Sequence, residues 1–325
     1  MIEIRLSSGD LARIRFAHSP LEELVHSVPV LAGVRPELLH RPWRAMALPR
    51  VRGLDLRLLL ALARGPRFLP DFLAPPPSRI TGRFEEELEA VVSAPPEAVR
   101  DSLEELRGDG GLSPELAELY EAPEHVLPRL ADTMRAYWTA VIEPVWPRLR
   151  ALHEADLDHR SRRLTTGGLA RMLADLHPEV DYVGDRLLID KPGHTGLRGP
   201  SGTGLLLLPS VFAWPRLIVL HNEPHAPALT YPPRGVGEVW ADTSEAAGSP
   251  LGALLGRSRA ALLAHLDLPA STSQLAAYLN MSSAAISQHL AVLRRSGLIS
   301  SRRSGRWMLH QRTSLASELV VAAAD

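Results

Sequence analysis

The sequence of 325 residues contains no cysteine. This absence excludes disulfide bonds, thiolate nucleophiles and zinc sites with cysteine ligands. The chain also lacks any uncharged run of about 18 apolar residues, so no transmembrane helix and no membrane partner are expected. The N-terminus does not show the basic and then apolar pattern of a signal peptide, and we therefore expect a cytoplasmic protein.

Lysine is almost absent, since Lys191 stands beside 35 arginines. Arginine is thus the general basic residue of this chain and does not by itself mark a bidentate contact. The net charge of −1 conceals an uneven distribution. Residues 251–325 carry 8 basic and 3 acidic residues (+5), whereas residues 1–250 carry 28 and 34 (−6). This difference predicts that only the C-terminal segment meets a polyanion.

The length and the changes of pattern predict an α+β protein with two domains. Residues 1–240 form a mixed, mostly helical effector or dimerisation domain with a small β-sheet. Within it, 83–163 is helical and 180–233 contains strands. Residues 241–250 are expected to be a linker, and residues 251–325 a winged helix-turn-helix domain.

Several N-terminal segments carry particular expectations. The alternating "MIEIRL" predicts a strand, and "VDYVGDRLLID" predicts a hairpin around Gly184–Asp185. "LDLRLLLALA" fits either a short buried helix or a strand. Pro144 and Pro147 are expected to kink the long helix that ends the helical region.

Helix caps and apolar spacing define the C-terminal domain. Leu251–Leu266 predicts one amphipathic helix, and Ser271 or Thr272 caps the next. Ser282 is placed as the N-cap of a third helix, Ser283 to about Ser296. A short turn separates the second and third helices, as in a helix-turn-helix.

The third helix has an apolar and a polar face. At 100° per residue, Ile286, Leu290 and Leu293 form one buried stripe. The opposite face is small and polar and then basic, which suits contacts with base edges and phosphates. The candidate DNA-binding residues of this helix and its cap are Ser282, Ser283, Ala284, Ser287, Gln288, Arg294 and Arg295. Arg294 could instead stabilise the carbonyl end of the helix.

A basic hairpin follows this helix. Gly297 is placed to end the helix, and "LISSRRSGRWMLHQ" predicts two strands around Ser304–Gly305. Trp307 and Leu309 share one face, which is expected to pack on the helices. The candidate phosphate or minor-groove contacts of the hairpin are Arg302, Arg303 and Arg306.

A last helix is predicted over Thr313–Val321, capped by Thr313 or Ser314. It is a candidate dimer helix. The alternative is that it packs within its own domain, against Leu251–Leu266.

The segment "LAAYLNMSSAAISQHLAVLRRSGLISSRRSGRWMLH" resembles the winged-helix domain of the ArsR/SmtB family of bacterial transcription factors. The resemblance spans Gly256–Arg312, under a fifth of the chain. It implies binding to double-stranded DNA by a homodimer. It also implies that Ser283, Ala284, Ser287 and Gln288 face the major groove, and it places His289 at the family's histidine.

The sequence differs from the metal-sensing members of this family in both helices that would hold the metal. The second helix has no cysteine, and the last helix offers only Glu318 as a ligand. No metal and no cofactor are therefore expected. The long N-terminal part resembles an uncharacterised extension found in front of this domain in actinobacterial regulators.

Three other segments contain residues of ligand-binding types. "GLRGPSGTG" (Gly196–Gly204) lacks the lysine of a phosphate-binding loop and precedes a strand rather than a helix. "HNEPH" (His221–His225) and "HEADLDH" (His153–His159) have no established metal-ligand spacing. No serine, histidine and aspartate form a catalytic motif, so we do not expect an enzyme.

These features predict a sequence-specific DNA-binding transcriptional regulator, acting as a repressor, whose N-terminal domain senses a small-molecule effector or a protein partner. One alternative is a non-specific architectural DNA-binding protein. Another is an N-terminal enzyme domain with a regulatory DNA-binding tail. A third is a winged helix that contacts only proteins.

Overall fold

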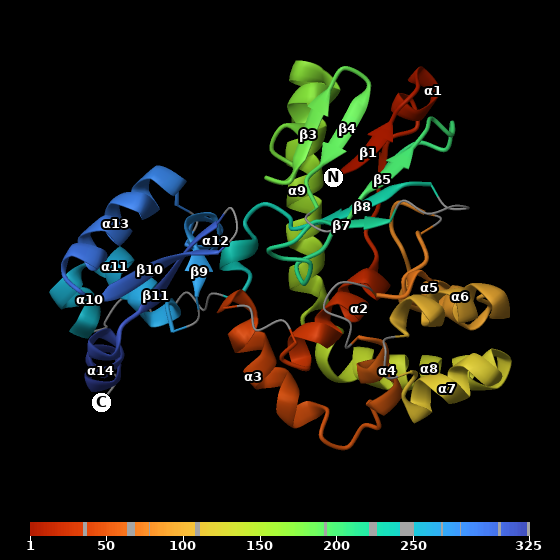
Figure 1. The fold of residues 1–325 in the computed structure, drawn as a ribbon, viewed down its shortest axis with the longest axis horizontal. Coiled ribbons are helices and arrows are strands. Elements are labelled where there is room, and N and C mark those ends of the chain that lie inside the picture. The colour runs from red at the N-terminus through yellow and green to blue at the C-terminus, as the bar shows by residue number, and fades with distance from the viewer. Residues whose placement is uncertain are drawn as a thin grey trace. The chain divides into compact units, whose positions relative to one another are not determined.

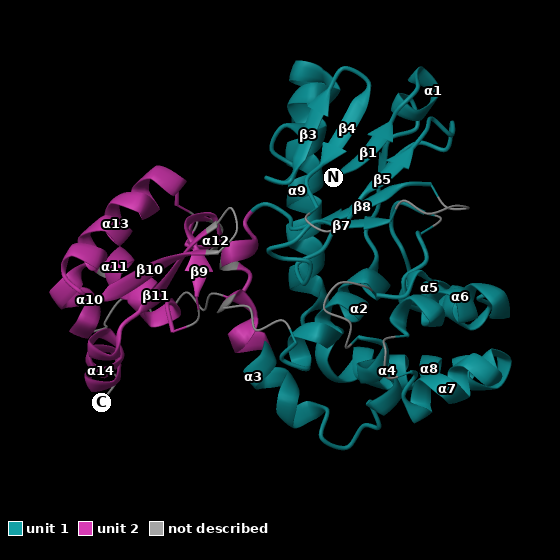
Figure 2. Ribbon diagram, viewed as in Figure 1, with its two compact units in different colours: residues 1–35, 44–234 teal, residues 36–43, 235–325 magenta. Residues whose placement is uncertain are grey.

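The computed structural model describes residues 1–34, 38–63, 69–77, 79–107, 111–191, 194–220, 226–240, 250–267, 269–279, 281–304 and 307–323. Two compact units emerge: Met1–Arg35 with Arg44–Arg234, and Pro36–Trp43 with Gly235–Asp325 (Figure 2). The first unit ends at Arg234, whereas the sequence predicted that the first domain ends at residue 240. Of the predicted linker 241–250, residues 241–249 lie outside the described residues.

The first unit contains two four-stranded sheets (Figure 1). One has the order β3-β4-β1-β5 and the other the order β2-β6-β8-β7. The strands are β1 (Ile2–Arg5), β2 (Arg15–Phe16), β3 (Val180–Val183), β4 (Arg186–Ile189), β5 (Gly196–Arg198), β6 (Leu206–Pro209), β7 (Ile218–Leu220) and β8 (Ala228–Tyr231). The expectation of one small sheet over 180–233 is therefore wrong, although strands do occupy that region.

Strands from the N-terminus complete both sheets. β1 pairs antiparallel with β4, with Ile2 opposite Ile189, and β2 pairs parallel with β6. The predicted N-terminal strand and the β3–β4 hairpin are confirmed, and Gly184 of the hairpin turn has φ 65°. The sequence did not predict β2 or β5, and it did not predict the number of sheets, because pairing between segments so distant in sequence produces no local periodic pattern.

Helices fill the chain between β2 and β3. They are α2 (Pro20–Leu31), α3 (Arg41–Arg50), α4 (Arg57–Leu62), α5 (Phe84–Val92), α6 (Pro96–Leu106), α7 (Pro114–Glu121), α8 (Pro123–Tyr137), η3 (Trp138–Ile142) and α9 (Trp146–Leu173). The ambiguous segment around residue 58 is a helix, α4. Among the helices of the described residues, none has the length and apolar character needed to cross a membrane.

The prolines expected to kink the last long helix lie where two helices meet. The π-helix η3 ends at Ile142, and α9 begins at Trp146 with Pro147 in its first turn. A first-turn proline lacks only an N–H that has no partner within the helix, so Pro147 starts α9 instead of bending it. The interruption lies later, at Gly168, where φ is 71°.

The end of α9 and both sheets share one apolar core. Met172 and Leu173 lie in the same buried cluster as Ile4 and Ile189 of the first sheet and Leu207 of the second. Figure 1 shows α9 running along the β3–β4 hairpin. Alternate residues of short strands thus supply most of the core of this part of the unit.

Glu23 of α2 is a carboxylate with 0% exposure. It accepts hydrogen bonds from His153 Nε2 (2.7 Å), from Ser210 Oγ (2.8 Å) and from the backbone N–H groups of Val211 (2.6 Å) and Phe212 (3.1 Å). Burial opposes the charge, but these donors outweigh it and hold the pKa of Glu23 below its ordinary value. Glu23 thereby joins α2 to α9 and to the segment after β6.

The second unit contains α10 (Pro250–Leu255), α11 (Arg257–His265), α12 (Thr272–Tyr278), α13 (Ser283–Arg295) and α14 (Ser314–Ala322). Its sheet has the order β10-β11-β9, formed by Ile299–Ser304, Trp307–Arg312 and Ala270–Ser271. The single helix expected over Leu251–Leu266 is wrong. Gly256, with φ 82°, divides it into α10 and α11, because a left-handed residue cannot continue an α-helix.

Replacing Glu23 by alanine should lower the free energy of unfolding by about 3–5 kcal/mol, because four buried donors lose their acceptor. Urea denaturation followed by circular dichroism measures this loss. The control is Glu89→Ala, on the exposed side of α5, which should change the value by less than about 0.5 kcal/mol. Equal effects of the two substitutions would contradict the assigned role of Glu23.

Candidate nucleic-acid interface

Helix α12 begins with a reciprocal pair of caps. Ser271 Oγ accepts the backbone N–H of Gln274 (3.3 Å), and Gln274 Oε1 accepts the N–H of Ser271 (2.7 Å). Of the two expected caps, Ser271 is therefore the N-cap, and Thr272 is the first helical residue. This capping box satisfies two N–H groups and defines where the helix starts.

A tight turn leads from α12 into α13. The backbone N–H of Met281 donates to Ala276 O (3.0 Å), and Ser282 Oγ accepts the N–H of Ala285 (3.2 Å). Ser282 is thus the predicted N-cap, and α13 starts at the predicted residue. Its hydroxyl still has a proton to donate to a second group.

Helix α13 has the two faces that the sequence predicts. Ile286, Leu290 and Leu293 are buried in a cluster with Leu263 and Leu275. On the other side, His289 is half-buried, and the exposed residues are Ser283, Ala284, Ser287, Gln288, Arg294 and Arg295. Because the apolar stripe sets the rotation of the helix about its axis, the small polar residues point into solvent together.

The end of α13 is a Schellman motif. Gly297 has φ 70° and its N–H donates to Arg294 O (3.0 Å), while the N–H of Leu298 donates to Leu293 O (2.9 Å). These are the two hydrogen bonds of that motif, and the left-handed residue is the predicted glycine. The chain turns here from α13 directly into β10.

The wing is the hairpin of β10 and β11, paired from Ile299 with Arg312 to Ser304 with Trp307. Its inner face carries His310, which is buried between Ser301 Oγ (2.8 Å from Nδ1) and Thr272 Oγ1 (3.2 Å from Nε2). Burial, and then the charge of Arg294, lower the pKa of His310. His310 thus links the wing to the start of α12.

Comparison with known families identifies the helix-turn-helix of the second unit. Residues 261–301 match the family described as bacterial regulatory protein, arsR family. The chain carries an ArsR-type helix-turn-helix domain. The protein is accordingly a DNA-binding transcription regulator, as its sequence predicts.

The N-terminal unit has a match of a different kind. Residues 97–237 match a family of unknown function, DUF5937. The combination of an ArsR-type domain with an uncharacterised N-terminal domain agrees with the resemblance drawn from the sequence. No curated protein and no solved structure matches the chain.

The wing of the ArsR-type domain differs from the expectation for its apolar residues. Leu309 is half-buried but does not belong to the apolar core, and the side chain of Trp307 lies outside the described residues. The strand alternates correctly, but its inward face carries His310 and Arg312. Arg312 donates from Nη1 to Leu263 O (3.2 Å) and from Nε to Ser317 Oγ (3.1 Å).

Arg302 and Arg303 of the wing lie on β10, the strand that α13 contacts. Arg302 and Arg303 are exposed, and Arg306 lies outside the described residues. The two arginines that end α13, Arg294 and Arg295, are exposed as well. The helix-turn-helix and the wing thus bring the predicted base-reading and phosphate-binding residues onto one small unit.

Two of the three other candidate segments have structural explanations. In the segment His153–His159, His153 donates to Glu23, and Asp156 accepts from Arg160 Nε (2.8 Å) and Tyr231 Oη (2.8 Å). In the segment Gly196–Gly204, Gly196–Arg198 form β5 and the remaining residues lead into β6, so the segment opens no helix. The segment His221–His225 lies outside the described residues.

The sequence did not predict that residues 36–43 belong to the second unit. The guanidinium of Arg41 forms an ion pair with Asp267, in the loop between α11 and β9. Gln311 of the wing donates to the backbone of that same aspartate, to Asp267 O (3.0 Å). No local pattern around Arg41 indicates a partner so far along the chain.

Replacing Ser282 by alanine should lower the free energy of unfolding of the ArsR-type domain by about 1 kcal/mol, because α13 loses its N-cap. Chemical denaturation of the full-length protein, followed by hydrogen exchange of the α13 amides, measures the effect. Its neighbour Ser283 is the matched control, since Ser283→Ala leaves the cap intact. A larger loss from Ser283→Ala would contradict the assignment.

Proposed function

We propose that this protein represses transcription by reading a specific operator with α13. The exposed face of Ser283, Ala284, Ser287 and Gln288 carries the proposal, since small side chains allow close approach to the major groove. Serine hydroxyls and the glutamine amide donate and accept hydrogen bonds at base edges. His289, at the margin of this face, is assigned a backbone or base contact.

In this proposal the phosphate backbone is held by arginines of α13 and of the wing. Arg294 and Arg295 follow the base-reading residues on α13, and Arg302, Arg303 and Arg306 belong to the wing. The charge of +5 on residues 251–325 supports this assignment, because neutralised phosphates release counterions. These contacts position the domain and do not distinguish sequences.

The regulator is proposed to act as a homodimer on a two-fold operator. α14 is the proposed dimer helix. Its inner face packs within the domain through Ala316, as the alternative expected, while Leu315 and Val321 on the helix are 53% and 62% exposed. Thr313 caps the helix, since its Oγ1 accepts the N–H of Ala316 (3.4 Å).

The N-terminal unit is proposed to be a sensor and not an enzyme. Two of its buried acids, Glu23 and Asp156, are saturated by structural hydrogen bonds, as described above. An effector that binds this unit would change operator affinity by a coupling free energy, typically about 1–3 kcal/mol.

Substituting Gln288 by alanine should change which operator base pairs are preferred, with a loss of about 5–100-fold at the position it reads. Binding to a set of single-base variants of an operator found by genome-wide mapping measures this preference. The control is Glu89→Ala, on the exposed side of α5 and outside the ArsR-type domain. An equal loss on every sequence would refute base reading by Gln288 and favour the architectural alternative.

The double substitution Arg303→Ala and Arg306→Ala should weaken binding to all DNA sequences and make the dependence of log K on log salt shallower by about 2. Titrations at several salt concentrations measure this slope. The matched control removes two arginines of α9, Arg150 and Arg162. An unchanged slope would exclude phosphate contacts by the wing.

A further inference from the structure

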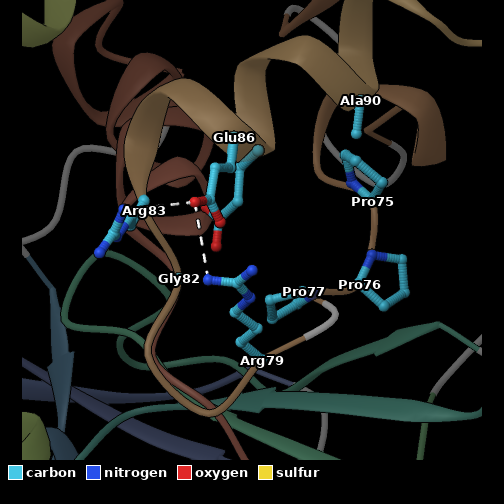
Figure 3. Close-up of a pocket in the computed structure, with 9 residues that line it drawn as sticks. Pro75, Pro76, Pro77, Arg79, Gly82, Arg83, Glu86 and Ala90 are labelled. Carbon is cyan, nitrogen blue, oxygen red and sulfur yellow. Dashed lines mark ion pairs between the residues drawn. The ribbon is translucent and has the colours of Figure 1, made fainter.

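The N-terminal unit contains a cavity of about 110 Å³ at the start of α5 (Figure 3). One wall consists of the consecutive prolines Pro75–Pro77, with Ala90 of α5 near them. Roughly 10–15 Å³ of such space admits one water, so the cavity has room for a ligand of several heavy atoms. Proline side chains are apolar and rigid, and they provide a preformed surface for a small apolar group.

A buried carboxyl group lines this cavity. Glu87 is 6% exposed, and its Oε2 accepts hydrogen bonds from Ser19 Oγ (2.9 Å) and from the N–H of Leu21 (3.0 Å). Its Oε1 has no hydrogen-bond partner among the described residues. A Cβ at Gly82 would lie 1.8 Å from Oε1, so a larger residue at this position would collide with the oxygen.

Glu87 is protonated at neutral pH. Burial, and to a lesser extent the negative charges of Glu22 and Glu86, raise the pKa of Glu87 to about 8 against the opposing hydrogen bonds to Oε2. Since Oε2 already accepts two hydrogen bonds, the proton belongs on Oε1. A buried O–H donor without an acceptor is costly, and a ligand oxygen would satisfy it.

Two cations stand at the mouth of the cavity. Arg79 and Arg83 both approach Glu86 Oε1, at 3.7 Å and 3.5 Å (Figure 3). Neither distance is that of a good hydrogen bond, so both guanidinium groups can turn to a ligand anion. The N-terminus of α5, a helix of nine residues, adds a positive partial charge at the same place.

We propose that this cavity binds a small organic carboxylate with a short apolar body. Its carboxylate accepts the proton of Glu87 Oε1 in a hydrogen bond and pairs with Arg79 or Arg83, while the apolar body lies against Pro75–Pro77. The proposal names the effector of the sensor function and therefore rests on it. Ligand binding is nevertheless measured without DNA, so either proposal can fail alone.

The groups that line the cavity favour a carboxylate over two other classes of ligand. A primary amine would need ionised Glu87 and would meet the arginine charges. Inorganic phosphate would leave the proline wall uncovered. A carboxylate is the class that uses the donor, the cations and the apolar wall together.

The test uses propionate and the full-length protein, with saturation-transfer NMR at pH 6.5 and pH 9. We expect a dissociation constant on the order of 1 mM at pH 6.5, since a ligand of this size offers few contacts. At pH 9 the affinity should fall about tenfold, because Glu87 loses its proton and repels the ligand. Arg79, Arg83 and Glu86 are further charged groups that line the cavity with Glu87. The pKa of His18, lowered to about 4 by burial, leaves that ring neutral throughout.

Glu87→Gln separates the carboxyl group from its surroundings, because the amide keeps a donor but does not titrate. This variant should bind propionate at pH 9 about as well as at pH 6.5. Glu89→Gln, on the exposed side of α5, should keep the pH dependence of the wild type. Thermal unfolding confirms that both variants are folded.

Four results would overturn the proposal. They are no binding of propionate at pH 6.5, equal affinity at both pH values in the wild type, tighter binding of propylamine than of propionate, and tighter binding of inorganic phosphate than of propionate. If propionate binds as expected but leaves operator affinity unchanged, the site stands and the sensor function fails.

Discussion

Burial of three side chains, Ile286, Leu290 and Leu293, is the constraint on which the DNA-binding surface depends. Their spacing fixes the rotation of α13, and everything at the opposite angle must face solvent. The caps at Ser282 and Gly297 fix the two ends of the same helix. A helix with fixed rotation and fixed ends presents its polar residues as a preordered set, which a specific interface requires.

Polar contacts join the wing to the other helices of the ArsR-type domain. His310 joins β11 to β10 and to the start of α12, and Arg312 joins it to the end of α11. His310 and Arg312 lie on the inward face of β11, opposite the face of Leu309 that the sequence predicted to pack on the helices. A buried group with all its hydrogen bonds made specifies one arrangement of its neighbours more narrowly than an apolar contact does.

In the N-terminal unit, two buried glutamates show how surroundings decide the chemistry of one residue type. Glu23 meets four donors, and its pKa is lowered despite burial. Glu87 meets two donors on a single oxygen and negative neighbours, and its pKa is raised to about 8. The first therefore acts as a charged structural link. The second is a neutral acid beside a cavity, with a proton available to a ligand.

The sequence by itself determined the ArsR-type domain in detail, because its information is local: α13 has a helical period, and its caps stand at either end. It also predicted β1 and the β3–β4 hairpin of the N-terminal unit, but not β2 or β5. Only the tertiary structure decided that those strands form two sheets, that Arg41 pairs with Asp267, and that Glu87 lies buried with one oxygen unpartnered among the described residues. These features join residues that are far apart in the chain, and contacts between distant residues produce no periodic pattern in the sequence.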